Sequence, residues 1–269
     1  MRIARSLVRA CHPLPTVAVT AVIGAFAWSL GWRAAPFAVL VVAVLAGQLS
    51  VGWSNDAYDA ELDARAGRIG KPVVAATVSV RVLWAVAVGA LAVSAALSWV
   101  AAGAIGGSFH VFSVAMAWLY NLRLSRTAAS WVPYALAFGA VPPFLTYGLD
   151  GTPPAPWTVA VFAIVGVSAH LANALPDVES DRAAGIGGLV VRLGARRSGE
   201  LCWSLLAVGT AILVAVTATS RPVVAGAALL AFAVAALWSW RSSSASTTFR
   251  ALLLVVAVDV VALVLAAGG

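Results

Sequence analysis

The sequence predicts an all-helical, multi-pass membrane bundle of nine transmembrane helices with its N-terminus in the cytoplasm. Of the 269 residues, 62% are hydrophobic and only 10% are charged, whereas an ordinary soluble domain has about 25% charged residues. Apolar runs long enough to cross a bilayer as a helix, which takes about 20 residues, recur between short polar breaks. We expect the whole chain, residues 1–269, to form a single domain.

The apolar runs are expected to form spans at residues 14–31, 36–54, 82–104, 105–122, 131–148, 157–175, 201–219, 222–240 and 250–267. The fourth run has the weakest signal, because Gly106, Gly107 and Ser108 dilute its start. The fifth run carries Pro142 and Pro143, which lack backbone donors and should kink the helix.

The first run allows a second interpretation. Three arginines followed by an apolar stretch ending in Ala25-Phe26-Ala27 also fit the pattern of a cleaved signal peptide. The apolar character continues to Trp32, which favours an uncleaved first helix. Cleavage would leave the orientation of the other spans unchanged.

The basic residues indicate the orientation. With a cytoplasmic N-terminus and nine alternating helices, 15 of the 17 Lys and Arg residues fall on the cytoplasmic side, and only Arg33 and Arg221 fall outside. This asymmetry is the one that the positive-inside rule describes. The net charge of +7 therefore reflects topology in a cell membrane, and we expect no nucleic-acid partner.

An N-D-x-x-D-x-x-x-D pattern lies at the cytoplasmic end of the second span. Its polar members are Asn55, Asp56, Asp59 and Asp63. At about 100° per residue, all four project within a sector of about 100°. The pattern predicts one polar face on a helix that extends beyond the membrane.

A D-x-x-x-D pattern lies at the cytoplasmic end of the sixth span. It comprises Asp177 and Asp181, and His170 and Asn173 come one and two turns before Asp177. If the helix continues through Pro176, these four side chains lie within about 80° of one another. The sequence thus predicts two acidic faces on the same side of the membrane.

Neighbouring carboxylates repel one another unless a cation neutralises them. Carboxylate oxygens with little His and no Cys suit Mg²⁺ rather than Zn²⁺ or copper. Because Mg²⁺ takes one or two carboxylates per ion and shares its shell with water and phosphate, five aspartates predict two or three ions and a phosphorylated ligand. Basic residues beside the acids would contact the phosphate: Arg65, Arg68, Lys71 and Arg182.

Two other interpretations of the acidic patterns remain open. Hydrated loops can carry paired charges that mark only topology, but two clusters with helical phasing favour a binding site. An ion-coupled transporter would place its ionisable residues near the bilayer midplane, whereas these lie at helix ends. Asp259, within the ninth span, is an intramembrane acid whose role the sequence leaves open.

Further short motifs accompany the acidic patterns. They are H12-P-L-P-T16, Lys71-Pro72, Y120-N-L-R-L, the R-A-A-G that begins at Arg182, and V-R-L-G at 191–194. With these motifs and N55-D-A-Y-D-A-E-L-D63 and D177-V-E-S-D181, nearly the whole chain resembles the UbiA superfamily of intramembrane aromatic prenyltransferases.

The resemblance implies an activity and a set of site residues. An isoprenyl group would move from an isoprenyl diphosphate to an aromatic or other lipophilic acceptor through a Mg²⁺-assisted allylic carbocation, with the active site opening to the cytoplasm. The implied Mg²⁺ ligands are Asp56, Asp59, Asp63, Asp177 and Asp181, of which Asp59 and Asp181 are the implied catalytic residues. The implied substrate contacts are Asn55, Arg68, Lys71, Tyr120, Arg123, Arg126, His170, Asn173 and Arg182.

The sequence departs from the family pattern in two places. A Lys that commonly follows the Tyr of the fourth helix is replaced by Ser125, and Arg123 or Arg126 would supply the charge. After the second acidic motif, Ile186-Gly187-Gly188 replaces a basic residue and Thr. These departures keep two alternatives open: a terpene cyclase of the same superfamily, and a non-catalytic lipid-phosphate binder or transporter.

Overall fold

The computed structural model describes residues 2–183, 185, 187–242 and 245–267, and these residues form helices and loops without any strand. They divide into two compact units. The first unit comprises Met1–Arg123 and Pro143–Pro153, and the second comprises Leu124–Pro142 and Pro154–Gly269.

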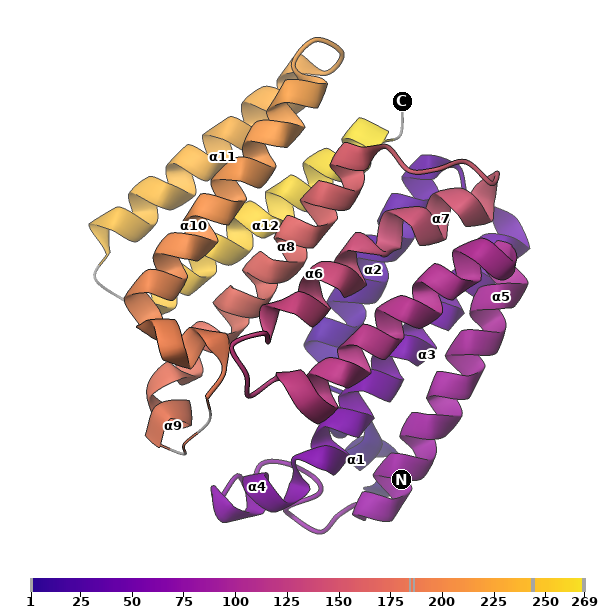
Figure 1. Ribbon diagram of the computed structural model, residues 1–269, viewed down its shortest axis with the longest axis vertical. Coiled ribbons are helices and arrows are strands. Elements are labelled where there is room, and N and C mark those ends of the chain that lie inside the picture. Colours follow the sequence, from indigo (N-terminus) through magenta and orange to yellow (C-terminus); the bar gives the residue numbers. More distant parts are fainter. Residues whose placement is uncertain (1, 184, 186, 243–244, 268–269) are drawn as a thin grey trace. The chain divides into compact units, whose positions relative to one another are not determined.

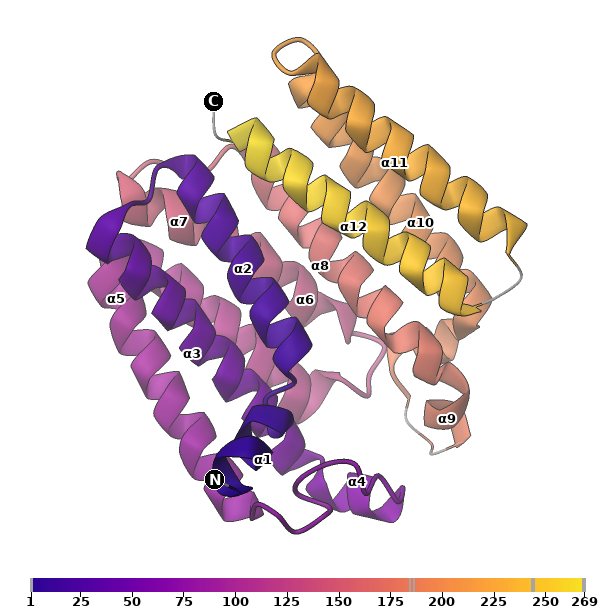
Figure 2. The same cartoon turned by 180° about the vertical axis from the view of Figure 1, so that it is seen from behind.

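The first unit is built on three long helices that pack side by side (Figures 1 and 2). They are α2 (Pro13–Leu30), α3 (Ala34–Tyr58) and α5 (Val80–Leu119). The shorter elements are α1 (Arg2–Ala10), α4 (Ala60–Arg65), the π-helical turn η1 (Tyr120–Leu124) and most of α7 (Val141–Leu149).

Helix α5 is a helical hairpin. Gly103 has φ 64° and ψ −172°, a conformation that glycine tolerates best. Figure 1 shows α5 folding back on itself. Ser98 Oγ lies 2.6 Å from His110 Nδ1, although these residues would be about 18 Å apart along a straight helix. The two arms therefore correspond to the expected spans 82–104 and 105–122.

The second unit is a bundle whose long helices are α8 (Pro156–Ala174), α10 (Leu189–Thr217), α11 (Pro222–Arg241) and α12 (Ala245–Ala267). Its shorter elements are α6 (Trp131–Gly139), the 3₁₀ turn η2 (Leu175–Asp177) and α9 (Val178–Ala183). Figures 1 and 2 both show α12 beside α8 and α10. Leu171, Cys202, Leu206, Leu252 and Val255 form the core where these helices meet.

Seven helical segments among the described residues are long and apolar enough to cross a membrane. That count takes the α5 hairpin as one segment and joins α6 to α7. The interruption expected near Pro142 is confirmed, since α6 ends at Gly139 and α7 begins at Val141. The protein is therefore an all-helical membrane protein.

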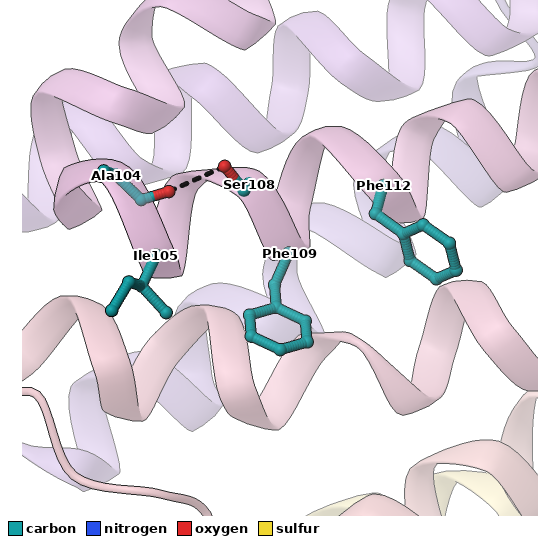
Figure 3. A pocket seen from close by; sticks show the side chains of 5 residues that line it. All are labelled: Ala104, Ile105, Ser108, Phe109 and Phe112. Atoms are coloured by element: carbon teal, nitrogen blue, oxygen red, sulfur yellow. Dashed lines mark hydrogen bonds between the residues drawn. The ribbon is translucent and has the colours of Figure 1, made fainter.

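An apolar groove of about 540 Å³ lies on the second arm of α5, just after the Gly103 bend. Its lining is Ala104, Ile105, Ser108, Phe109 and Phe112 (Figure 3). The one hydroxyl in it is used within the helix, because Ser108 Oγ donates to the Ala104 carbonyl (2.7 Å). The groove offers no polar group that would recognise a phosphate.

Candidate functional site

The first acidic pattern lies where α3 turns into α4. The expectation of one straight helix through Asp63 is wrong, because α3 ends at Tyr58 and Asp59 adopts φ −85°, ψ 0° before α4 begins. The turn keeps its hydrogen bonds: Asp59 N donates to Asn55 O (2.9 Å) and Asp63 N donates to Asp59 O (2.8 Å). The backbone therefore bends at Asp59 without leaving these groups unpaired.

Asp56 and Asp63 form a buried carboxylate pair with Lys71 between them. The two aspartates are 1% and 0% exposed. Lys71 Nζ lies 2.8 Å from Asp56 Oδ1 and 2.7 Å from Asp63 Oδ2. One ammonium thus bridges two carboxylates that are seven residues apart in the sequence.

Two further groups contact this pair. Arg68 Nη1 donates to Asp63 Oδ1 (3.0 Å), and His12 Nε2 lies 3.0 Å from Asp56 Oδ1. Lys71 and Arg68 together carry as much positive charge as the two aspartates carry negative charge. The pair is therefore neutralised by the chain itself, as burial of carboxylates requires.

Asn55 and Asp59 form a second, less buried pair in the same segment. Asn55 Nδ2 lies 3.4 Å from Asp59 Oδ2, and both residues are partly exposed. The helical projection placed all four residues on one polar face, whereas the structure divides them. Asp59, like Asn55, is partly exposed to solvent, whereas Asp56 and Asp63 are buried.

The segment before α2 is held against the end of α3 by close backbone packing. A Cβ at Gly52 would overlap the carbonyl of Cys11, so the glycine permits the approach. Trp53 Nε1 donates to Leu7 O (2.9 Å), and Ser6 Oγ donates to Thr77 Oγ1 (2.9 Å). These contacts place His12 and the loop after Lys71 around Asp56.

The environment of Lys71 favours its charged form. Burial by itself disfavours the ammonium, but the hydrogen bonds and charges of Asp56 and Asp63 outweigh burial and raise the pKa of Lys71 above its ordinary value. Lys71 is also the single lysine of the chain, since the other 16 basic residues are arginines.

The Y120-N-L-R-L motif forms the π-helical turn η1 at the end of α5. Its buried Asn121 donates through Nδ2 to Val51 O (2.9 Å) and Ser54 Oγ (3.1 Å). Because Ser54 precedes Asn55, this amide fastens the turn directly beside the first acidic segment. Tyr120 is partly exposed and Arg123 is exposed.

The second acidic pattern is not a continuous helix either. Helix α8 ends at Ala174, and Leu175–Asp177 forms a 3₁₀ turn before α9 begins at Val178. Pro176 explains the break, because proline lacks the N–H that an α-helix needs. The α-helix therefore does not continue through Pro176, and the condition for placing the four side chains on one helical face is not met.

As a result, the polar side chains of this pattern lie in different surroundings. His170 is buried, whereas Asn173 and Asp177 are exposed and Asp181 is partly exposed. Arg182 donates to Glu179 Oε1 and Oε2 (2.9 and 3.0 Å) and to the Val191 carbonyl (3.3 Å). It thus links α9 to the start of α10.

His170 belongs to a buried cluster centred on Ser130. Ser130 Oγ lies 3.0 Å from His170 Nε2 and accepts a hydrogen bond from Leu189 N (3.2 Å). The Tyr134 ring packs on the imidazole at 4.8 Å between centroids. In this arrangement His170 connects α8 to the loop before α6 and to the N-terminus of α10.

The two departures from the family pattern meet in the second unit. A Cβ at Gly188 would lie 2.9 Å from the Ser125 carbonyl, and one at Gly187 would lie 3.4 Å from the Arg126 carbonyl. The glycines therefore let the segment before α10 pack against the backbone around Ser125. Ile186 lies outside the described residues.

A metal site has to be judged by its donors. No three His, Cys, Asp or Glu side chains among the described residues are already gathered in a metal-binding arrangement. The first segment nevertheless offers carboxylate and amide oxygens, which Mg²⁺ prefers, and two of its carboxylates already share one cation, the Lys71 ammonium. The donor set therefore fits Mg²⁺.

Three residues of these clusters were not among the expected site residues: His12, Asn121 and Ser130. His12 and Asn121 nevertheless lie within the short motifs H12-P-L-P-T16 and Y120-N-L-R-L. His12 could have been found, because it is the only His near the N-terminus and precedes Pro13 at the start of an apolar span. Asn121 follows the predicted contact Tyr120. The role of Ser130 could not be predicted from the sequence, because its partners His170 and Leu189 lie far along the chain in α8 and α10.

The fold and these clusters define a class: a membrane-embedded helical protein with two acidic segments that carry basic neighbours. The UbiA prenyltransferase family model matches residues 17–267. The chain belongs to this family. A comparison with curated protein sequences found no significant match.

Solved structures share the fold at low sequence identity. A UbiA homolog from Archaeoglobus fulgidus bound to GPP and Mg²⁺ is 16% identical, with a TM-score of 0.69 over 98% of this chain and 100% of that one. A digeranylgeranylglyceryl phosphate synthase is 12% identical, with a TM-score of 0.71 over 99% of each chain. A UbiA homolog from Aeropyrum pernix K1 without ligand is 16% identical, with a TM-score of 0.68 over 97% of this chain and 98% of that one.

Proposed function

We propose that this protein is an integral-membrane prenyltransferase that moves an isoprenyl group from an isoprenyl diphosphate to an aromatic or other lipophilic acceptor. The observation that carries the proposal is the buried Asp56–Lys71–Asp63 arrangement in a chain of the UbiA prenyltransferase family. Homologs with this fold have been solved with GPP or DMAPP and Mg²⁺ bound, which supports a diphosphate substrate here.

The aspartates are the proposed Mg²⁺ ligands: Asp56, Asp59, Asp63, Asp177 and Asp181. When bound, Mg²⁺ would neutralise charge on the departing diphosphate as a Lewis acid. Arg68 and Lys71 would then donate to the diphosphate oxygens, with Asn55 and Asn173 as polar contacts. The remaining proposed contacts are Tyr120, Arg123, Arg126, His170 and Arg182.

The apolar helices would hold the prenyl tail and exclude water, which would otherwise quench the allylic cation. We propose nine spans, with α5 contributing two and α12 the last. The N-terminus and the active site would then face the cytoplasm, as the positive-inside rule requires for the arginine distribution. The whole chain would act as one domain.

The proposal is tested with purified protein in detergent. Geranyl, farnesyl and geranylgeranyl diphosphates are supplied with Mg²⁺ and with or without aromatic acceptors, and products are identified by mass spectrometry. We expect Mg²⁺-dependent diphosphate release that an acceptor stimulates and that Asp59→Ala and Asp181→Ala abolish. Glu61→Gln is the matched control, because Glu61 is an exposed acid of the same segment that pairs with Arg65.

Other outcomes would reject transfer. Diphosphate release without an acceptor, together with a cyclic hydrocarbon or alcohol, would identify a terpene cyclase. Binding of a polyprenyl phosphate with no turnover in the presence of any acceptor would identify a lipid-phosphate binder or transporter.

A further inference from the structure

We propose that Lys71 is a resident counter-ion of the first acidic segment, which has to leave the Asp56–Asp63 pair before a divalent cation can bind there. This inference rests on the proposed function and concerns the regulation of the same site. It makes the affinity of the site for a divalent cation higher when an anionic ligand is present to receive the displaced ammonium.

The first argument is geometric. Nζ contacts Asp56 Oδ1 at 2.8 Å and Asp63 Oδ2 at 2.7 Å. A Mg²⁺ ion bound to the same oxygens, at its usual distance of about 2.1 Å, would overlap the nitrogen. The ammonium and the metal ion therefore compete for one position.

The second argument concerns charge. Lys71 and Arg68 already balance the two aspartates, which are buried. A divalent cation added to this neutral cluster would bring two uncompensated positive charges into a buried site, which is unfavourable. Movement of Lys71 onto a diphosphate removes one of these charges and pairs the ammonium with a new anion.

The third argument is mobility. The backbone around Lys71 is fixed, because Lys71 N donates to Arg68 O (3.0 Å) and Ala75 N donates to Lys71 O (3.0 Å). The lysine side chain is 22% exposed and has a flexible four-carbon stem, so the ammonium can move while the loop stays in place. His12 contacts the same Asp56 Oδ1 as Lys71, and Arg68 contacts the other oxygen of Asp63, Oδ1. Both contacts remain to orient the carboxylates when Lys71 moves.

The chain offers one lysine and 16 arginines, and the lysine stands at this position. A planar guanidinium binds carboxylates through a rigid fork, whereas an ammonium is a compact point charge. A compact ammonium is the better group for occupying a metal-sized position between two oxygens.

The test measures Mn²⁺ binding alone, without any diphosphate, by electron paramagnetic resonance on the purified protein. We expect Lys71→Gln to bind Mn²⁺ at least about tenfold more tightly than the wild type, because a competing charge is lost, while its KM for the prenyl diphosphate rises. The gain in Mn²⁺ affinity of Lys71→Gln over the wild type should be lost in the double variant Lys71→Gln/Asp63→Asn. Arg81→Gln, which removes an exposed charge ten residues away, should leave Mn²⁺ affinity unchanged.

A measurement on the unaltered protein covers the case in which Lys71→Gln does not fold. Acetylation of the single lysine is followed by mass spectrometry. We expect it to accelerate in saturating Mn²⁺ and to slow again when inorganic diphosphate is added.

Several results would overturn the inference. One is Mn²⁺ binding by Lys71→Gln that is equal to or weaker than that of the wild type, and another is no Mn²⁺ binding by either protein. The third is an acetylation rate of Lys71 that does not change when Mn²⁺ binds. If the wild type binds Mn²⁺ as expected but releases no diphosphate from any prenyl donor, the proposed function fails while the exchange of Lys71 for a metal ion stands.

Discussion

His12 Nε2 lies 3.0 Å from Asp56 Oδ1, which joins the residue before α2 to the end of α3 across 44 positions of the sequence. His12 itself has φ 53°, an uncommon conformation for a residue other than glycine. The packing of Gly52 against Cys11 holds the backbone there. The first acidic segment is thus positioned by the N-terminal segment as well as by its own helix.

Replacement of His12 by Ala should weaken the metal dependence of the proposed reaction. Loss of a hydrogen bond to a buried carboxylate costs about 1–3 kcal/mol. We therefore expect the Mg²⁺ concentration for half-maximal diphosphate release to rise about tenfold or more. His12→Gln can still donate and should restore much of the effect. An unchanged Mg²⁺ dependence in His12→Ala would show that His12 does not position Asp56.

Replacement of Gly52 by Ala should destabilise the protein. The added methyl group would overlap the Cys11 backbone, and overpacking of this kind costs about 1–3 kcal/mol. Gly89→Ala is the matched control within a helix, because nothing lies within 4 Å of its added Cβ. Thermal unfolding in detergent should show a lower Tm for Gly52→Ala and no loss for Gly89→Ala.

Replacement of Ser130 by Ala should loosen the second unit. It leaves His170 and the Leu189 amide without a shared partner, and a buried polar group that loses its hydrogen bond costs about 1–3 kcal/mol. Ser204→Ala is the control, because Ser204 is exposed and its hydroxyl bonds only to its own helix, at Glu200 O. Equal Tm values for the two variants would refute a structural role for the Ser130 cluster.

Asp259 receives a structural role from its contacts. Thr210 Oγ1 donates to its carboxyl group at 2.9–3.1 Å, which links α10 to α12 inside the second unit. Thr210→Val should lower Tm, because it leaves a buried acid unpaired. The double variant Thr210→Val/Asp259→Leu should recover most of the loss. A double variant that is less stable than Thr210→Val would contradict this assignment.

Alkaline pH should reveal the Lys71 contacts. Because its pKa is raised above the ordinary value of 10.5, the ion pairs stabilise the fold fully below that pH and lose their effect as pH rises through the folded-state pKa. We expect the Tm difference between the wild type and Lys71→Met to shrink above about pH 10.5. The difference between Lys71→Arg and Lys71→Met should persist, because arginine stays charged. If the Tm difference between the wild type and Lys71→Met does not change with pH, the ion pairs of Lys71 do not stabilise the fold.

Local patterns were enough to predict much of the architecture. Apolar runs mark the helices, and Pro142 interrupts α6 and α7 as expected. The glycines that weaken the apolar signal of the fourth run are explained by close packing. A Cβ at Gly107 would lie 2.8 Å from the Ser98 carbonyl of the other α5 arm. The straight extension of α3 through Asp63 was wrong, because helical spacing cannot report a bend at a single residue.

The sequence by itself determined the membrane class, the family and the residue types of the acidic segments, because hydropathy, charge placement and motif spacing are properties of neighbouring residues. Only the tertiary structure decided that Lys71 bridges Asp56 and Asp63, that His12 reaches Asp56, and that His170 binds Ser130. These partners lie 8 to 44 residues apart, and the packing of helices and loops brings their side chains together.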